Sequence, residues 1–388
     1  MTKPAESIAV VLFQLGGPDS LEAVEPFLYN LFSDPDIIDF PFARLARPTL
    51  ARLISSRRAR HVQEHYASIG GKSPIRELTE RQAVALECEL RRTIDARVFV
   101  AMRYWHPLTE EAVEQAVRGE FHHLVLLPLY PQYSKTTTGS SLNAWNRQYN
   151  ARARQPLPTR LVREFFDHPG YLDAVVEKIN EGLAMFPEGR DAARMSSAES
   201  VSSADTGLDD VHLVFSAHGV PVRVIESGDP YQEQIEETVR LVMARGGWPN
   251  PHVLCWQSRV NPGKWLEPSL SETLRSLAAR GPGPDTARRG TRPASADDAV
   301  LPNGAGRGAP RVLVIPISFV TDHVETLAEI DIEARSLAHQ LGIAQFQLMP
   351  ALNDSPTFIR ALADLVLAQL AIPASAAAAS HNPPHSRP

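Results

Sequence analysis

Short apolar segments alternate with longer segments of helical periodicity along most of the chain. The apolar segments are 8–15, 98–102, 124–129, 211–215, 253–256, 312–317 and 346–349. Buried parallel strands consist of short continuous apolar runs, and their alternation with helices is typical of α/β folds. The pattern predicts two doubly wound, Rossmann-like halves, each with a parallel β-sheet flanked by helices, and a ligand cleft between the halves.

A helical stretch near residue 169 separates the two groups of strands. We expect four regions in chain order: an N-terminal α/β half (1–168), a C-terminal α/β half (169–350), a C-terminal helix (351–372) and a disordered tail (373–388). Two further segments, about 188–210 and about 280–310, are rich in Ser, Ala, Asp, Gly, Pro and Arg. Because neither carries enough apolar surface to offset the entropy of ordering, we predict disordered insertions in the second half.

Length and charge narrow the class of protein. The chain has 388 residues and a formal net charge of -6, which argues against a general nucleic-acid binder. Its first residues contain no basic segment followed by a long apolar one, and no stretch approaches the roughly 20 apolar residues of a spanning helix. We therefore expect a cytoplasmic protein without a nucleic-acid partner.

Cysteine content limits the metal chemistry. The only two cysteines are Cys88 and Cys255, which are far apart in the sequence. Two thiols cannot form a disulfide framework, a four-cysteine zinc site or a four-cysteine iron–sulfur site within one chain. A metal ion would have to be held by His, Asp or Glu side chains.

Between residues 37 and 60, apolar side chains are interleaved with arginines. Apolar bulk with a basic fringe is typical of a helix that lies on an anionic membrane surface, or of a lip over an apolar ligand. The same pattern also fits an ordinary amphipathic helical pair that is broken at Pro48 and has solvated arginines. The sequence leaves both interpretations open.

Two strand ends carry ionisable residues. The strand at 211–215 leads to His218, which is followed by glycine and proline, and the strand at 312–317 leads to Asp322, Glu325 and Glu329. Taken singly, a histidine at a strand end is usually structural, and carboxylates at helical spacing usually form a solvated face. Because parallel strands deliver their carboxyl ends to one crevice, the combination points to metal and proton traffic.

The chain resembles the ferrochelatases in an ordered series of motifs. They are 15–20, 30–36, 66–75, 102–107, 127–134, 137–141, 216–219, 256–260, 319–331 and 352–356. The two insertions and the tail lie outside this resemblance. It implies insertion of Fe2+ into protoporphyrin IX to give protoheme, the last step of heme biosynthesis, with release of two protons and no permanent cofactor.

The resemblance also implies roles for the ionisable residues. His218 would abstract protons from the macrocycle, with direct iron ligation as the competing role, because a neutral imidazole can do either. Glu325 would lie across the pocket as a second metal ligand. Glu325, Glu329 and Asp322 would shuttle protons or deliver metal, with Glu325 and Glu329 one turn apart on one helical face. His323 would have a supporting role.

A bent macrocycle exposes a nitrogen lone pair, so bulky and rigid pocket walls would lower the barrier. By resemblance, the substrate-binding residues would be Leu15, Tyr104 and Trp265 as walls, Arg103 beside them, and Arg58, Tyr66, Ser73 and Ser258 as donors to the propionates at the rim. Trp256 is a further candidate for the wall. No G-x-G-x-x-G follows the first strand and no Walker lysine is present, so a dinucleotide or ATP site is not expected.

Some ferrochelatases carry a [2Fe–2S] cluster bound through cysteines, most of them in a C-terminal extension. The corresponding region here has none, so we expect a cluster-free enzyme and a monomer, with peripheral contact to the inner face of the membrane through 37–60 as an option. Three alternatives remain: a chelatase that uses coproporphyrin, a chelatase for another metal, and a non-catalytic carrier of tetrapyrrole or metal.

Overall fold

The computed structural model describes residues 6–36, 43–187, 208–258, 263–280 and 309–371. Most of the two predicted insertions, the whole predicted tail and residues 37–42 of the predicted lip lie outside the described residues. The domain boundaries expected from the sequence remain predictions.

The first sheet contains four parallel strands in the order β2-β1-β3-β4. They are β1 (Ser7–Gln14), β2 (Asp95–Met102), β3 (His123–Pro128) and β4 (Thr159–Leu161). The helices beside this sheet are α3 (Ile75–Leu90), α4 (Thr109–Arg118) and α5 (Ser140–Arg152). Alternate residues of β1 enter two different cores: Val11 and Phe13 pack with α4 and α5, whereas Val10 and Leu12 pack with α3. Burial on both faces explains why this strand is apolar throughout.

The second sheet repeats the same strand order, as β6-β5-β7-β8, and is also parallel. Its strands are β5 (Val211–His218), β6 (His252–Gln257), β7 (Arg311–Pro316) and β8 (Gln345–Leu348). Its helical elements are α6 (Pro169–Ala184), α7 (Val222–Glu226), α8 (Tyr231–Gly246), α9 (Leu270–Arg280), the π-helix η2 (Glu325–Ala334) and α10 (Arg335–Gln340). Two parallel sheets flanked by helices confirm the predicted fold class.

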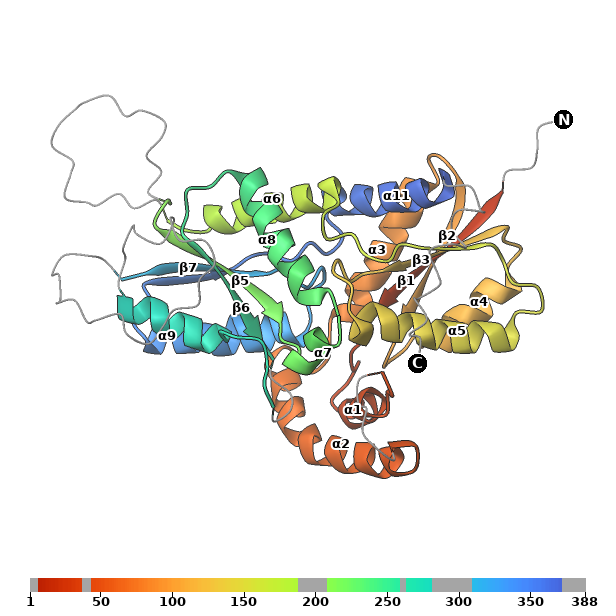
Figure 1. The fold of residues 1–388 in the computed structure, drawn as a ribbon, viewed down its shortest axis with the longest axis horizontal. Coiled ribbons are helices and arrows are strands. Elements are labelled where there is room, and N and C mark those ends of the chain that lie inside the picture. Colours follow the sequence, from red (N-terminus) through yellow and green to blue (C-terminus); the bar gives the residue numbers. More distant parts are fainter. Residues whose placement is uncertain (1–5, 37–42, 188–207, 259–262, 281–308, 372–388) are drawn as a thin grey trace.

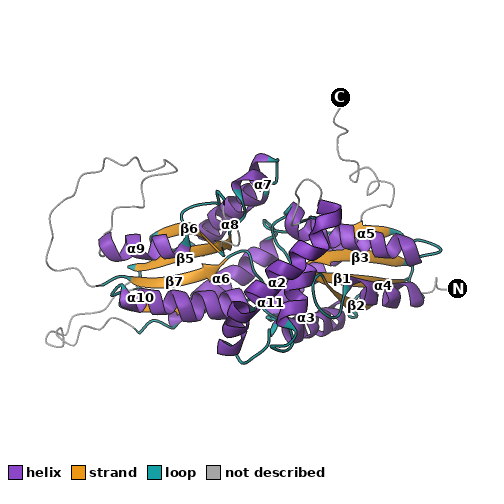
Figure 2. Cartoon of the chain, turned by 90° about the horizontal axis from the view of Figure 1, so that it is seen from below, coloured by secondary structure: helices purple, strands orange, loops and turns teal. Residues whose placement is uncertain are grey.

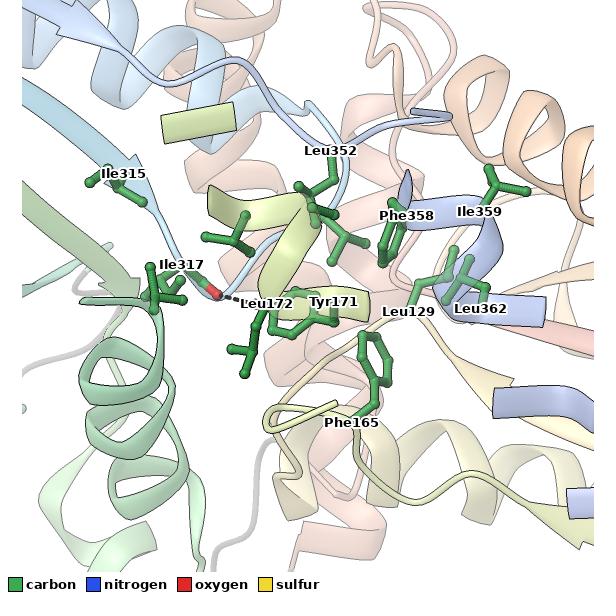
Figure 3. Close-up of a cluster of buried hydrophobic side chains, with 14 of the residues drawn as sticks. Leu129, Phe165, Tyr171, Leu172, Ile315, Ile317, Leu352, Phe358, Ile359 and Leu362 are labelled. Carbon is green, nitrogen blue, oxygen red and sulfur yellow. Dashed lines mark hydrogen bonds between the residues drawn. The ribbon is translucent and has the colours of Figure 1, made fainter. Parts of the chain in front are cut away.

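A shared apolar core joins the two sheets. The C-terminal helix α11 (Pro356–Ala371) packs against α6 of the second half and against α3, β3 and β4 of the first. Figure 3 shows the cluster between them, in which Tyr171 Oη donates a hydrogen bond of 3.2 Å to the carbonyl of Ile317. The buried cluster runs without a break from β1 to β5 and β7, so the halves are held together by packing as well as by the chain.

Polar contacts fasten the loop after β3 to the second half. Asp229, which is 4% exposed, accepts hydrogen bonds from Ser134 Oγ at 3.0 Å and from the backbone N–H of Lys135 at 2.7 Å. Nearby, Gln132 Nε2 donates to Thr238 Oγ1 at 3.1 Å. These residues lead into the π-helix η1 (Lys135–Gly139), so that both the loop and the helix are fixed by the opposite half.

The helices α1 (Val24–Phe32) and α2 (Ala43–Ser68) lie on the side of the molecule opposite α6 and α11 (Figure 1). Figure 2, which views the molecule from below, shows α2 across the middle of the picture, where the two halves meet, and α2 contacts η2 of the second half. Because α2 continues through Pro48, the alternative of a helical pair broken there is wrong. Pro48 lies in the first two turns, where a proline interrupts one backbone hydrogen bond, and the packed remainder of the helix tolerates that loss.

The strands of both sheets run toward the middle of the molecule and toward α2 (Figure 1). Their carboxyl ends therefore face the region where the two halves meet. Within the described residues, no helix combines the length and the apolarity needed to cross a bilayer.

Candidate active site

The ionisable residues lie at the topological switch point of the second sheet. In the order β6-β5-β7-β8, the connections reverse direction between β5 and β7, which is where ligands bind in open parallel sheets. His218 is the last residue of β5, and Glu325 begins η2 after β7. Parallel pairing also sets His218 opposite Gln257, the last residue of β6, so three strand ends converge on one place.

His218 and Glu325 form a direct pair. The distance between His218 Nδ1 and Glu325 Oε2 is 2.8 Å, and the side chains are 33% and 15% exposed. Such a carboxylate fixes the orientation and the tautomer of an imidazole and increases its basicity. The resemblance placed Glu325 across the pocket from His218, whereas in the structure the two side chains are in direct hydrogen-bond contact.

Ser258 and Gln257 connect Glu325 to a second carboxylate. Ser258 Oγ lies 3.1 Å from Glu325 Oε2 and 2.5 Å from Glu329 Oε2, and Gln257 Nε2 donates to Glu325 Oε2 at 3.4 Å. A serine hydroxyl has a single proton, so it can donate to only one of the two carboxylates at a time. A protonated Glu329 would donate to Ser258 Oγ while Ser258 donates to Glu325.

The surroundings separate the pKa values of these groups. Burial favours neutral His218, but the charge of Glu325 and its hydrogen bond outweigh burial and raise the pKa of His218. Burial also favours neutral Glu325, yet the charge and the hydrogen bond of His218 lower its pKa to about 2. For Glu329, burial and the neighbouring charge of Glu325 raise the pKa to about 7. Glu325 is therefore ionised at neutral pH, whereas Glu329 exchanges its proton there.

The two glutamates belong to a π-helix, although their spacing of four suggested an ordinary α-helical face. The wider turn of a π-helix arises from i→i+5 hydrogen bonds, and such segments occur often at functional sites. Both carboxylates still reach Ser258, so Glu325 and Glu329 do share one face of the helix.

Several contacts fix the turn that carries His218. Its backbone N–H donates to Ser318 Oγ at 3.0 Å, and its carbonyl accepts from Tyr231 Oη at 3.0 Å. The next residue, Gly219, donates to the carbonyl of Gln257 at 2.7 Å. A Cβ at Gly219 would approach that same carbonyl to 2.8 Å, so only glycine fits beside β6.

Asp322 and His323 make other contacts. Asp322 accepts from Thr326 Oγ1 at 3.1 Å and from Asn353 Nδ2 at 2.9 Å. His323 is 5% exposed, its Nδ1 lies 3.0 Å from the carbonyl of Thr321, and burial lowers its pKa. The hydrogen bonds of Asp322 thus go to Thr326 of η2 and to Asn353, and that of His323 goes to the loop after β7, so these residues brace the start of η2.

In the first half, Arg103 and Tyr104 are bound to a buried carboxylate. Asp34 Oδ2 accepts from Tyr104 Oη at 2.6 Å, from Arg103 Nη2 at 2.9 Å and from Ser140 Oγ at 2.5 Å. Burial raises the pKa of Asp34, but the charge of Arg103 and the hydrogen bonds of Ser140 and Tyr104 outweigh it and lower the pKa. Tyr104 is only 1% exposed, and the guanidinium of Arg103 is already occupied by Asp34.

The expected rim residues lie in different environments. Ser73 is 4% exposed and packs against Gly17. Tyr66 is 2% exposed, and burial together with the charges of Glu325 and Glu329 raises its pKa. The guanidinium of Arg58 lies 5.8 Å from the centre of the Phe32 ring.

The expected wall residues also differ in position. Leu15 is partly buried against the cluster of α1 and α2. Trp265 is 9% exposed and lies beside the turn of His218, where its ring is 3.5 Å from the position of a Cβ on Gly219. Trp256 is 4% exposed within the core of the second half.

Sequence reasoning did not assign roles to Gln257, Ser318, Tyr231 or Asp34. Gln257 lies in the motif 256–260, and Asp34 lies in 30–36, so position within a motif was the available signal. Ser318 directly follows β7 and could have been recognised as a strand-end residue. Tyr231 had no such signal, because its contact with His218 depends on how α8 packs.

A cavity of about 700 Å³ lies away from this chemistry, at the amino ends of the first sheet. Its lining includes Ile8 of β1, Asp95 of β2, Arg160 of β4, and Arg91 and Arg92 after α3. Ligands of open parallel sheets bind at the opposite, carboxyl ends. We therefore place the candidate site at His218 and not in this cavity.

Comparisons with known proteins agree with the resemblance seen in the sequence. The family model described as ferrochelatase matches residues 7–283 and 295–370. The ferrochelatase of Nostoc punctiforme (strain ATCC 29133 / PCC 73102) is 42% identical over 94% of this chain and 83% of its own length. That of Geobacter metallireducens (strain ATCC 53774 / DSM 7210 / GS-15) is 46% identical over 93% of this chain and 98% of its own length.

A distant likeness was found among solved structures. SirB from Bacillus subtilis with Fe3+ aligns with 94% of this chain and 96% of its own, with a TM-score of 0.48 and 10% sequence identity. The family match and the sequence identities are much stronger than this likeness, and by them the chain belongs to the ferrochelatase family.

Proposed function

We propose that the site of His218, Glu325, Glu329 and Ser258 inserts Fe2+ into protoporphyrin IX and releases protoheme and two protons. Membership of the ferrochelatase family makes the chain a metal chelatase of the lyase class, which acts in heme biosynthesis with iron as a substrate. The observation that carries the proposal is the pair of His218 and Glu325 at the switch point of the second sheet, with Glu329 one hydroxyl away.

His218 acts as the base in this proposal. Its Nδ1 is paired with Glu325, so Nε2 is the nitrogen that would accept a pyrrole proton, and the raised pKa of His218 makes it a stronger base once neutral. Loss of two N–H protons leaves a porphyrin dianion, which balances the charge of Fe2+. Glu325 then stabilises the imidazolium and offers oxygen ligands to the arriving ion.

Glu329 is the group that would remove protons from the site. A carboxyl group with a pKa of about 7 accepts and releases protons readily near neutral pH. Ser258 Oγ lies within hydrogen-bond distance of both glutamates and provides the connection between them. We assign Asp322 and His323 to positioning of η2, since their contacts go to Thr326, Asn353 and Thr321.

The assignment of substrate-binding residues is part of the same proposal. Trp265 and Leu15 would form the walls, while Arg58, Tyr66 and Ser258 would lie nearest the substrate. Arg103 and Tyr104 would act from behind, because both are bonded to Asp34. Ser73 would also act from behind, because it packs against Gly17. We expect protoporphyrin to be preferred over coproporphyrin because the sequence of the lip is rich in apolar residues, which suits a substrate with only two propionates.

A cluster-free monomer in the cytoplasm completes the proposal. Cys88 is exposed on α3 and Cys255 is buried in β6, and two thiols in different halves cannot supply a four-ligand cluster. Peripheral contact with the inner face of a membrane would use α2, whose exposed side carries Arg52, Arg57 and Arg60 beside the 44% exposed Leu53.

The test is anaerobic incubation of the purified protein with Fe2+ and protoporphyrin IX, with heme identified in the product. Repeated turnover is expected, together with a lower rate on coproporphyrin III. Faster turnover on coproporphyrin III would reverse the substrate assignment. Stoichiometric binding without heme formation, under conditions where another ferrochelatase turns over, would instead identify a carrier.

A further inference from the structure

We propose that Gln82 of α3 is a positioning residue for Glu325 and acts on it from the first half of the molecule. It does so through hydrogen bonds to Thr321, in the loop after β7, and to Asn353, in the loop before α11. We call these three residues the α3 latch. The inference rests on the proposed function, because the position of Glu325 affects turnover only if Glu325 takes part in the reaction.

Gln82 is fully buried, and both ends of its amide bind residues of these loops. Its Nε2 donates to the carbonyl of Asn353 at 2.8 Å, and its Oε1 accepts from Thr321 Oγ1 at 3.2 Å. Gln82 is 0% exposed and Thr321 is 2% exposed. A buried amide costs free energy unless it is hydrogen-bonded, so the contact of α3 with both loops depends on this alignment. The nearby pair of Arg81 and Asp354 is exposed and contributes little.

Asn353 uses every polar group that it has at this position. Its side chain binds Asp322 twice: Oδ1 accepts from the backbone N–H at 3.1 Å, and Nδ2 donates to Oδ2 at 2.9 Å. Its own N–H donates to the carbonyl of Val320 at 2.8 Å. Its φ of 40° lies in the left-handed region, which asparagine tolerates better than most side chains do. Asn353 therefore clamps residues 320–322 while its carbonyl accepts from Gln82.

Asp322 links the latch to the helix that carries Glu325. Its Oδ1 accepts from Thr326 Oγ1 at 3.1 Å, and Thr326, which is 1% exposed, directly follows Glu325 in η2. A shift of residues 320–322 would thus move the first turn of η2 and the carboxylate that pairs with His218. A misplacement of about 1 Å can lower a rate by as much as about 10².

The amino end of α3 begins at the predicted substrate rim. The helix has 16 residues and starts at Ile75, two residues after Ser73, whose backbone N–H donates to the carbonyl of Pro18 at 2.8 Å. From Ile75 to Gln82 an α-helix rises by about 10 Å. One rigid element therefore connects the rim in the first half with the start of η2, and the latch fixes the spacing between them.

The first test measures the latch without porphyrin or turnover. Hydrogen exchange of the backbone amides of 320–330 is followed by mass spectrometry in wild type, in Gln82→Leu and in the milder variant Thr321→Val. Because both variants remove hydrogen bonds of the latch, we expect exchange in this segment to be at least about threefold faster.

Thr79→Val is the matched control for this test. It removes a buried hydroxyl of the same helix, whose hydrogen bond of 2.6 Å goes to the carbonyl of Ile75 and not to the second half. Exchange of 320–330 should therefore stay as in wild type. Unchanged exchange in both latch variants, or equally fast exchange in Thr79→Val, would overturn the latch.

The second test asks whether the latch positions Glu325 for the reaction. Thr321→Val should lower kcat by about three- to tenfold and leave KM for porphyrin unchanged. Thr321→Ser keeps the hydroxyl and should restore kcat. The double variant of Gln82→Leu and Thr321→Val should be no slower than Gln82→Leu alone, because both substitutions remove the same hydrogen bond.

Two outcomes would refute the positioning role: a kcat in Thr321→Ser as low as in Thr321→Val, or losses that multiply in the double variant. If the wild type makes no heme, the proposed function fails, yet hydrogen exchange in 320–330 still decides whether the latch exists.

Discussion

The two sheets have the same strand order but opposite chemistry at their carboxyl ends. In the first half, Asp34 is fully buried and its partners Arg103, Tyr104 and Ser140 satisfy it. In the second half, His218 remains one-third exposed, and its partner Glu325 is linked to a carboxyl group that titrates near neutral pH. The same topology is therefore accompanied by different chemistry: the charges near the carboxyl ends of the first sheet form a compensated anchor, and those of the second sheet form the proposed reactive site.

The difference lies in how completely the charges are compensated. A buried charge with a full set of donors is held in one protonation state, so Asp34 fixes the ends of α1 and β2 without taking part in proton transfer. Glu325 and Glu329 share one hydroxyl, and that shortage of donors leaves one carboxyl group able to take up and release a proton. We expect the first half to respond to substitution mainly in stability and the second mainly in catalysis.

The largest effect is expected for His218→Ala, because it removes the proposed base. The kcat should fall by about 10² to 10⁴, the usual contribution of general base catalysis, while porphyrin binding measured by fluorescence persists. His212→Ala is the matched control: His212 lies near the amino end of the same strand β5 and should keep most of the activity. Comparable losses in both variants would show that the carboxyl end has no special role.

Asp34→Asn should act on the first half through stability. The amide that replaces the carboxylate can still accept from Tyr104 and Ser140, but the guanidinium of Arg103, 15% exposed, loses its counter-charge. We expect the free energy of unfolding in urea to fall by about 3 kcal/mol, as for other broken buried pairs. The folded fraction should retain far more of its kcat than His218→Ala does. A loss of kcat as large as in His218→Ala, with stability intact, would place Arg103 or Tyr104 in the reaction itself.

The sequence was sufficient for the fold because burial on both faces leaves a clear pattern. Each of the seven apolar segments lies on a strand, since residues such as Val10 and Val11 of β1 face two separate cores. The strand β4 was not predicted, because three residues that include Thr159 and Arg160 give no apolar run. The identical order of the two sheets was not visible either, since topology can persist without sequence repeat.

From the sequence, only the site residues that lie at strand ends or within motifs could be predicted. The pairing of His218 with Glu325 follows from adjacent parallel strands, and their motifs drew attention to both. The π-helix was not predictable, because the spacing of Glu325 and Glu329 is the same as on an α-helix. Equally, the burial of Tyr104 and Ser73 depends on the packing of other elements, so a sequence motif could not distinguish a wall of the pocket from its support.

The difference in stability between Glu329→Gln and wild type should depend on pH, and this dependence tests how the carboxylates of the second half differ from Asp34. Glu329 has a pKa of about 7 in the folded chain against 4.5 as a free side chain, so between these values the folded state binds more protons than the unfolded state. Its contribution to stability is therefore lost as pH rises from 4.5 to 7. The variant should match wild type in unfolding near pH 4 and be more stable by about 1–2 kcal/mol at pH 8, after allowance for partial exposure.

The control for this prediction is Glu226→Gln, which removes an exposed carboxylate from α7 of the same half. If Glu226→Gln increases the free energy of unfolding at pH 8 by the same amount, the gain in stability comes from the net charge of the protein and not from the crowding of Glu325 and Glu329. The kcat of Glu329→Gln should also fall, because an amide cannot exchange protons.

The smallest expected effects concern Ser258, which has a backbone φ of 63° in the left-handed region. Ser258→Ala and Ser258→Gly both remove the hydroxyl between the two glutamates, so both should lower kcat by about three- to tenfold. Only glycine adopts a positive φ without strain, so Ser258→Gly should be the more stable of the two by about 0.5–1 kcal/mol.

The pair of variants separates two explanations of how the carboxylates of the second half are held. Equal kcat values with unequal stabilities would mean that the hydroxyl itself couples Glu325 to Glu329, as the distances of 3.1 Å and 2.5 Å suggest. If kcat follows stability instead, the strained backbone at Ser258 positions the carboxylates and the hydroxyl carries no proton. The second half would then depend on a rigid scaffold in the same way as Asp34 and Arg103 do in the first, and the contrast between the two strand ends would rest on His218 alone.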